Sequence, residues 1–237
     1  MKLATHILNS PVIESLGELI APTRCAGCER QGVLLCHICL TQLSRDYLQS
    51  QACPKCAGPY GALTCTECWE ISYSFSHALA LGILDGPLAR SIVLYKDANE
   101  RRLAKVLGYK LAECVHDNWN NWIDSQAAIC WIPATDEAVR RRGFDHAELL
   151  AHEVADCLQI PAYPLLSRTE ARDQRGLSRR QRLKGLQQFT CKRGDVPDKV
   201  LLIDDIFTTG ATLDAAASSL LDAGVKEVRT AVLGRTW

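Results

Sequence analysis

The sequence lacks two features that would place the protein in a membrane or on bulk nucleic acid. Its 27 basic and 27 acidic residues cancel, so any attraction to a polyanion has to come from a local cluster of charge. No stretch forms the run of about 20 apolar residues that a membrane-spanning helix needs. Residues 1–21 are interrupted by His6, Asn9 and Glu14, which argues against the apolar core of a signal peptide. We therefore expect a soluble, cytoplasmic protein without a membrane span.

The 237 residues leave room for one α/β core and a small additional module. Near the N-terminus, apolar side chains such as Leu3, Ile7 and Ile20 recur at roughly helical spacing. This spacing predicts an N-terminal helical segment over residues 1–22, whose apolar face packs on the rest of the protein or on a partner.

Large apolar residues are scarce between Thr23 and Trp69, but cysteine is abundant there. Eight of the chain's 12 cysteines form four Cys-x-x-Cys pairs, a spacing typical of zinc knuckles. The gaps within each set are short, and the longer segment 40–52 separates the sets, so we predict two sequential zinc sites of four cysteines each. An interleaved pairing is the alternative. The predicted ligands are Cys25, Cys28, Cys36, Cys39, Cys53, Cys56, Cys65 and Cys68.

Residues 23–72 are therefore interpreted as a double zinc ribbon. A reducing cytosol disfavours disulfides, and a redox Cys-x-x-Cys motif does not require four copies. Because this segment cannot bury enough apolar surface to fold alone, zinc binding worth on the order of 10 kcal/mol or more per site would supply its stability. Such a module serves as a scaffold or docking element, or it contacts nucleic acid or protein.

The remaining residues, 73–237, alternate between strand and helix patterns. Strands are predicted over 76–84 and 127–133, and a last strand over 227–233. Helical spacing predicts two helices between Leu88 and Trp119, with a break at residues 97–99. This alternation favours an α/β fold with an open, mostly parallel sheet, flanking helices and a ligand at the carboxyl ends of the strands.

The most informative stretch runs from Val200 to Leu221. β-prone apolar residues lead into Asp204 and Asp205, and a threonine-rich loop around Gly210 then leads into a helix pattern. Backbone N–H groups and the positive end of a helix dipole converge on such a loop, which suits a phosphate. Two carboxylates beside it match sugar hydroxyls and Mg²⁺ better than a bare phosphate. Together they suggest phosphoribosyl pyrophosphate (PRPP). The alternative is a helix N-cap with a solvated neighbour.

Residues 204–212 resemble the PRPP-binding signature of type I phosphoribosyltransferases: Asp204-Asp205-Ile206-Phe207-Thr208-Thr209-Gly210-Ala211-Thr212. The resemblance implies that Asp204 and Asp205, the candidate catalytic pair, hold the ribose hydroxyls. It also implies a cradle for the 5′-phosphate formed by Thr208, Thr209, Gly210, Ala211 and Thr212. Enzymes of this family that act on 6-oxopurines carry an acid at the place of Thr208, so we do not expect this chain to be one of them.

Further motifs narrow the resemblance to the ComF family of competence-associated proteins, which also carry an N-terminal cysteine ribbon. They occur in order along the chain: Leu94-Tyr95-Lys96, Ile132-Pro133, Arg142-Gly143-Phe144, the region from Arg168 to Arg182, and the PRPP loop. Two positions depart from the family pattern. Asp145-His146 stands where Asn-Gln is common, and Gly185 stands where Asn usually follows the arginine. Asp145 thus adds a negative charge near the expected pyrophosphate.

Basic residues dominate the span from Ser167 to Lys184. A flexible basic loop can close over a pyrophosphate and exclude water. The same residues can hold the phosphates of single-stranded DNA, or they form only a solvated charged face. The candidate residues for the pyrophosphate are Lys96, Arg142, Gly143, Arg168, Arg179 and Arg182.

The family resemblance implies a protein of natural transformation that binds PRPP with Mg²⁺ and assists the handling of incoming single-stranded DNA, with other competence proteins as partners. One alternative is a salvage phosphoribosyltransferase that transfers the 5-phosphoribosyl group to a base. Another is a zinc-ribbon adaptor on an inactive transferase scaffold. Residues 84–121 show no aromatic and amide pattern that identifies an acceptor base.

Overall fold

The computed structural model describes residues 22–45, 52–59, 65, 68, 70–168, 189–191 and 194–236. Residues 1–21 of the predicted N-terminal segment lie outside the described residues, as do Arg179 and Arg182. No helix in the described part of the chain is both long and apolar enough to cross a membrane.

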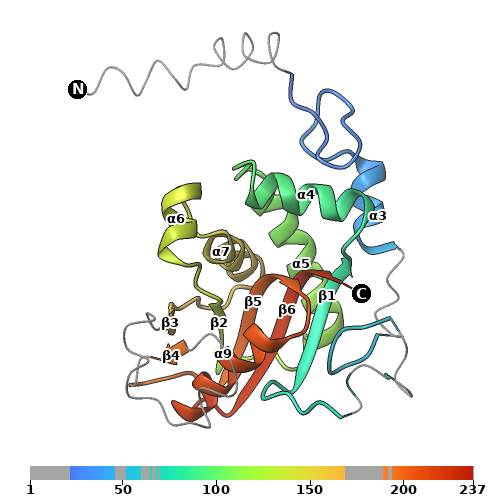
Figure 1. Cartoon of the computed structure of the whole chain (residues 1–237). Helices are drawn as coiled ribbons and strands as arrows, with labels where there is room; N and C mark the ends of the chain where they lie inside the picture. The colour runs from blue at the N-terminus through green and yellow to red at the C-terminus, as the bar shows by residue number, and fades with distance from the viewer. Residues whose placement is uncertain are drawn as a thin grey trace, which may run out of the picture.

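A parallel sheet forms the centre of the molecule (Figure 1). Within the described residues it has four strands, which lie in the order β1-β6-β5-β2. They are β1 (His77–Ile83), β2 (Ala127–Trp131), β5 (Lys199–Phe207) and β6 (Glu227–Arg235). Because each neighbouring pair is parallel, the carboxyl ends of all four strands meet at one edge, where open α/β sheets bind ligands. The predicted α/β fold with a mostly parallel sheet is confirmed.

Three helices cover one face of the sheet: α4 (Gly86–Lys96), α5 (Leu103–Trp119) and α7 (His146–Leu158). Successive strand residues point to opposite faces, so Leu201 packs into this helical layer, whereas Leu202 packs into the layer behind the sheet. The two predicted helices and the break after Lys96 are confirmed.

The opposite face is covered by α9 (Ala211–Asp222) and by an antiparallel hairpin of β3 (Leu166–Arg168) and β4 (Phe189–Cys191). The predicted helix after the threonine loop is thereby confirmed. Three cysteines of the second predicted zinc site share this core with α9 and Phe75: Cys53, Cys56 and Cys68. The predicted division at residue 72 stays a prediction.

Two short helices complete the described fold, namely α3 (His37–Arg45) and α6 (Asp136–Arg142). Helix α3 contacts α4 and β1, so it joins the first cysteine set to the α/β core. Thr135 is the N-cap of α6, and its hydroxyl accepts a hydrogen bond from the Ala138 N–H at 3.2 Å. Gly143 is the C-cap, and its φ of +77° lies in the left-handed region that favours glycine. The turn from α6 into α7 therefore has a defined geometry.

Candidate ligand site and cysteine centres

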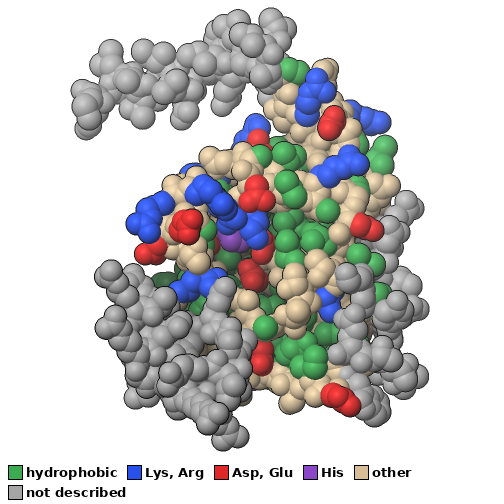
Figure 2. All heavy atoms as spheres, viewed as in Figure 1, with side chains coloured by type: hydrophobic (Ala, Val, Ile, Leu, Met, Phe, Trp, Pro, Cys, Tyr) green, Lys and Arg blue, Asp and Glu red, His purple; other side chains and the backbone are tan. Residues whose placement is uncertain are grey.

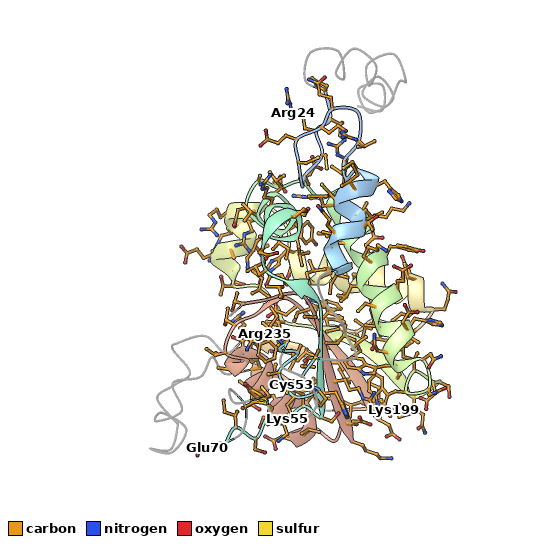
Figure 3. All side chains as sticks on the ribbon, turned by 90° about the vertical axis from the view of Figure 1, so that its right-hand side faces the viewer. Arg24, Cys53, Lys55, Glu70, Lys199 and Arg235 are labelled. Atoms are coloured by element: carbon orange, nitrogen blue, oxygen red, sulfur yellow. The ribbon has the colours of Figure 1, made fainter. Side chains whose placement is uncertain are left out.

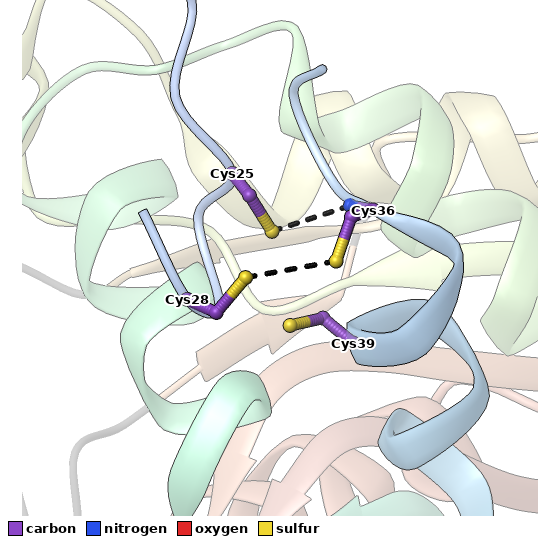
Figure 4. Close-up of side chains that lie close together, drawn as sticks. All are labelled: Cys25, Cys28, Cys36 and Cys39. Carbon is purple, nitrogen blue, oxygen red and sulfur yellow. Dashed lines mark hydrogen bonds between the residues drawn. The ribbon is translucent and has the colours of Figure 1, made fainter. Parts of the chain in front are cut away.

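The first cysteine centre consists of Cys25, Cys28, Cys36 and Cys39, whose sulfur atoms all lie within 4.8 Å of one another (Figure 4). The Cys28 and Cys36 sulfurs are 3.6 Å apart, and the Cys36 N–H donates to the Cys25 sulfur at 3.2 Å. Thiolates on one tetrahedral zinc ion, with Zn–S bonds of about 2.3 Å, are separated by about 3.8 Å, whereas a disulfide requires about 2.05 Å. The donor set therefore fits zinc.

The second cysteine centre consists of Cys53, Cys56, Cys65 and Cys68. Cys53 and Cys68 have their sulfurs 3.4 Å apart, and so do Cys56 and Cys65. All four sulfurs lie within 4.8 Å of one another. The cysteines are thus grouped sequentially along the chain, as predicted, and the two clusters fit two zinc ions.

The thiols of the first centre differ in acidity. Burial alone would raise the pKa of Cys25, but hydrogen bonds from the backbone of Cys36, Cys28 and Gly27 outweigh burial and lower this pKa to about 6. Burial and the neighbouring thiols raise the pKa of Cys39 above its usual range. Four thiolates in contact therefore need a cation to ionise together, and zinc supplies that charge.

The acid pair lies at the carboxyl end of β5. Asp205 is buried, and one of its carboxylate oxygens contacts both the Lys96 ammonium group and, at 3.3 Å, Nε2 of His146. Asp204 is half-buried and accepts a hydrogen bond from the Asp205 N–H at 2.9 Å. One donor atom each from His146, Asp204 and Asp205 lie within 4.8 Å of one another, so the site can present two carboxylates and an imidazole to a ligand.

The same environment acts on the two acids in opposite directions. Burial would raise the pKa of Asp205, but the hydrogen bond from His146 and the charge of Lys96 lower this pKa below its usual range. Burial and the adjacent Asp205 carboxylate raise the pKa of Asp204 well above its usual range. Asp205 therefore holds the negative charge, and Asp204 holds a proton more tightly than an ordinary aspartate does.

His146 connects the acid pair to Arg142. Nη1 of Arg142 lies 3.3 Å from Nδ1 of His146. Because a guanidinium donates and does not accept, Nδ1 of His146 is the acceptor, which places the ring proton on Nε2, facing Asp205. The Tyr95 hydroxyl donates to the His146 carbonyl at 2.6 Å, so the end of α4 fixes the start of α7. His146 was not among the predicted site residues, since its position in the sequence is far from that of Asp205.

The predicted phosphate loop lies between β5 and α9. Gly210 caps α9 with a φ of +78°. A Cβ on Gly210 would come within 2.6 Å of the Phe207 ring and 2.9 Å of the Tyr73 ring, so only glycine fits this position. Thr208 and Thr209 are exposed, and the Thr209 hydroxyl accepts from the Ala211 N–H at 3.4 Å. The helix N-terminus and the threonines together present donors to solvent.

Arg142 and Gly143 lie at the end of α6, and His146 connects Arg142 to the acid pair. Besides His146, Arg142 contacts the Asp97 carboxylate at 3.2 Å, while its buried Nε–H has no hydrogen-bond partner among the described residues. Nη2 of Arg101 donates to the Gly143 carbonyl at 3.2 Å. A surface cavity of about 400 Å³ adjoins this turn, lined by Asp97, Asn99, Arg141 and Arg142.

Basic side chains gather over α6, beside acidic side chains on the same face (Figure 2). Arg168, at the end of β3, donates to the Pro133 carbonyl at 2.5 Å, and its guanidinium lies 5.1 Å from the centroid of the Phe189 ring. The structure thus brings Lys96 against Asp205 and Arg142 against His146, while Gly143 caps the end of α6 and Arg168 lies on the β3–β4 hairpin.

Asp145, the departure from the family pattern, has a structural explanation. One carboxylate oxygen accepts from the N–H groups of Ala147 at 2.9 Å and Glu148 at 3.2 Å, and the other accepts from Ala134 at 2.7 Å. The side chain therefore caps α7 and ties its start to the segment that follows β2. These three N–H groups compensate the negative charge that the sequence places near the turn.

The site combines an acid pair, a glycine-capped helix and a cationic turn at one edge of a parallel sheet. The phosphoribosyl transferase domain family matches residues 140–235. Competence protein F of Haemophilus influenzae is 28% identical over 89% of this chain and 90% of its own length.

Two further relatives agree with this match. Competence protein ComFC of Streptococcus pneumoniae is 29% identical over 85% of this chain and 87% of its own length. DNA utilization protein YhgH of Escherichia coli K12 is 25% identical over 85% of this chain and 90% of its own length. These matches confirm the resemblance to the ComF family that the sequence motifs indicate.

Proposed function

We propose that this chain is a cytoplasmic protein of natural transformation that binds PRPP with Mg²⁺ at the carboxyl end of β5 and assists the handling of incoming single-stranded DNA. The observation that carries the proposal is the pairing of Asp204 and Asp205 with the glycine-capped N-terminus of α9. Similarity to proteins named for competence and DNA utilization supports the biological role.

Each part of PRPP has matching groups at the site. The 5′-phosphate matches the donors of residues 208–212, and the ribose hydroxyls match the acid pair. Lys96 and Arg142 match the pyrophosphate, since Lys96 contacts Asp205 and Arg142 contacts His146, which lies against the same carboxylate. Mg²⁺ prefers carboxylate oxygens and waters as ligands. Asp204 and Asp205 can provide the carboxylate oxygens, and the ion would neutralise part of the pyrophosphate charge.

Calorimetric titration of the zinc-loaded protein with PRPP, with and without Mg²⁺, tests the ligand. Saturable binding is expected, and it should be stronger with Mg²⁺. The double variant Asp204→Asn with Asp205→Asn keeps the shape of both side chains and should lose binding while its circular dichroism spectrum stays unchanged. Equal affinity in this variant would refute the assignment of the acid pair.

The DNA part of the proposal is tested separately. Arg140 and Arg141 are exposed on α6, and the basic span beyond Arg168 adds further cations. Fluorescence anisotropy with a labelled single strand should show an affinity that falls as salt rises, and falls again when Arg179, Arg180 and Arg182 are changed to Gln. Affinity that is indifferent to both salt and these changes would exclude a backbone-binding role.

Group transfer is a second candidate, favoured by the cavity of about 400 Å³ beside Arg142. In that reaction the bond from the ribose C1 to pyrophosphate breaks, and a bond from C1 to an acceptor nitrogen forms, with cations stabilising the departing pyrophosphate. Pyrophosphate release upon addition of a panel of bases would establish the transferase. Binding of PRPP without pyrophosphate release would indicate a ligand-sensing protein. Absence of PRPP binding would indicate a zinc-ribbon adaptor.

A further inference from the structure

The second cysteine centre lies against the predicted phosphate loop. Arg235, the last residue of β6, is buried, and its side chain reaches both regions. Figure 3 shows Arg235 in the same part of the molecule as Cys53, while Arg24, near the first cysteine centre, lies at the far end. The spacing of the cysteines does not reveal this arrangement, because Arg235 lies 179 residues from Cys56 in the chain.

Three interactions of Arg235 connect the regions. Its Nε–H donates to the Cys56 carbonyl at 2.9 Å. Its Nη1 donates to the Thr208 carbonyl at 2.7 Å, at the start of the phosphate loop. The guanidinium carbon lies 4.7 Å from the centroid of the Phe207 ring. One planar group thus fixes the distance between a cysteine ligand and the loop.

The segment that follows Cys68 provides a second connection. The Tyr73 hydroxyl donates to the Thr209 carbonyl at 3.1 Å, and the Ser74 N–H donates to the Asp214 carboxylate at 2.6 Å, in the first turn of α9. Tyr73 also stacks on Phe75 with ring centroids 4.6 Å apart, and both rings meet Phe207 edge-on. The phosphate loop is therefore held on the side that faces the second centre.

We propose that the second cysteine centre, when it holds zinc, positions the phosphate loop through Arg235, so that zinc at this centre and a phosphate ligand in the loop stabilise each other's binding. The inference rests on the proposed function, because it assumes that the loop binds the phosphate of PRPP. It makes Arg235 a positioning residue that does not touch the ligand.

The physical basis is the rigidity and charge of the metal centre. A zinc ion with four thiolates carries a net charge of −2, which a neighbouring guanidinium helps to compensate. With zinc bound, Cys56 has a fixed position, and its carbonyl orients the guanidinium that holds the Thr208 carbonyl. Without zinc, the position of Cys56 is no longer fixed, so Arg235 no longer holds the phosphate loop in place. The N–H groups of the loop then no longer point toward one phosphate position. Coupling between two binding sites is reciprocal, so the phosphate ligand must retain zinc equally well.

The first cysteine centre offers a matched control. There, Nη1 of Arg90 donates to the Gly27 carbonyl at 2.8 Å, so an arginine again contacts a carbonyl within a Cys-x-x-Cys turn. Arg90 belongs to α4 and has no described contact with residues 207–212. Changing Arg90 therefore removes the same kind of bond without touching the phosphate loop.

The test compares Arg235→Gln with Arg90→Gln in the full-length, zinc-loaded protein, using calorimetry with PRPP and metal analysis. We expect Arg235→Gln to weaken PRPP binding about 10- to 100-fold, the range found for groups that support metal ligands, and Arg90→Gln to change it by less than about twofold. Arg235→Lys should recover part of the affinity, and Tyr73→Phe should show a smaller loss. Equal PRPP affinity in Arg235→Gln and the wild type would overturn the proposal.

Two further readouts keep the test decisive. The first readout is the rate at which zinc passes from the second centre to a chromogenic chelator. Both proteins carry Cys28→Ala, which removes the signal of the first centre. Added PRPP should slow the transfer from the otherwise wild-type protein but not from Arg235→Gln.

The second readout is hydrogen exchange of residues 204–214. It decides the inference if the wild type does not bind PRPP, in which case the proposed function fails. Exchange should be faster in Arg235→Gln and Arg235→Lys than in Arg90→Gln, and equal rates would refute it.

Discussion

The two cysteine centres have the same ligands and the same spacing pattern, but they occupy different places in the fold. The first packs against the start of α4, where Gly27 lies close to Pro87, and Cys28 is exposed. The second has Cys53 and Cys56 buried in the core that α9 shares, beside the phosphate loop. The same four-cysteine motif therefore packs beside α4 in one place and beside the predicted phosphate loop in the other, and the carbonyl groups of its turns contact different arginines.

The largest expected effect comes from removing one ligand at each centre. Cys68→Ala should lose one zinc ion, lower the free energy of unfolding by about 4 kcal/mol or more, and abolish PRPP binding, because the second centre lies in the shared core. Cys28→Ala should also lose one zinc ion but keep PRPP binding. Metal analysis, thermal unfolding and calorimetry check both variants. An equal loss of PRPP affinity in the two would contradict the claim that only the second centre supports ligand binding.

The next largest effect concerns Asp205, which should matter for the ligand and for neither zinc ion. Asp205→Ala removes the buried partner of Lys96 and His146, and removing one partner of a buried ion pair costs about 3–5 kcal/mol of stability. Denaturant unfolding measures this loss. Asp205→Ala with Lys96→Met should recover part of it, and no recovery would show that the pair is not coupled.

The pH dependence of PRPP binding separates the acid pair from both cysteine centres. Asp204 has a raised pKa, so its proton leaves, and its carboxylate becomes available to the ligand, only as the pH rises through that value. PRPP binding should tighten over this range while both centres keep zinc, and Asp204→Asn should flatten the profile. A profile that is identical in wild type and variant would contradict the role of Asp204.

The same pKa shifts contribute to the pH dependence of the free energy of unfolding. The folded state binds the Asp204 proton more tightly than the unfolded state, so the stability from Asp204 is present below an unfolded pKa of about 3.9 and is lost as the pH rises through the raised folded value. Asp205 has the opposite sign, because its pKa is lowered. Its contribution is present above about pH 3.9 and is lost as the pH falls through the folded value.

The smallest effect on the ligand is expected from a change at the first centre. A Cβ on Gly27 would come within 2.6 Å of the Cys39 sulfur and 2.9 Å of the Pro87 side chain. Gly27→Ala should therefore weaken zinc binding at the first centre and lower stability by about 1–3 kcal/mol, while PRPP affinity stays within about twofold. A chelator competition assay and calorimetry measure the two quantities, and a large loss of PRPP affinity would show that this centre also controls the site.

Local patterns in the sequence were sufficient to predict the elements and motifs whose residues are neighbours in the chain. The apolar run into Asp204, the glycine of the loop and the Cys-x-x-Cys spacing each depend on neighbouring residues, and the structure confirms the corresponding strand, helix and cysteine groupings. Helix α6 could not be predicted from a periodic pattern of apolar residues, because its seven residues include three arginines and none of the seven is buried.

Contacts between distant residues could not be predicted in this way. His146 meets Asp205 only because β2 and β5 are neighbours in the sheet, so that α7, which follows β2, begins beside the end of β5. Arg235 lies two residues beyond the strand predicted over 227–233, although it is the last residue of β6 in the structure. Its contact with Cys56 depends on how the cysteine segment folds back against the sheet. The Cys-x-x-Cys spacing indicates which cysteines form a cluster, but it does not indicate which distant residues pack against that cluster.

Hydrogen exchange of the zinc-loaded wild-type protein with and without PRPP and Mg²⁺ tests the central claim most directly, because it locates the ligand on the chain. We expect PRPP to slow exchange in residues 204–214, which contain the acid pair and the phosphate loop, and to leave residues 25–39 at the first cysteine centre unchanged. Protection that is absent from 204–214, or confined to another segment, would contradict the assignment of the PRPP site.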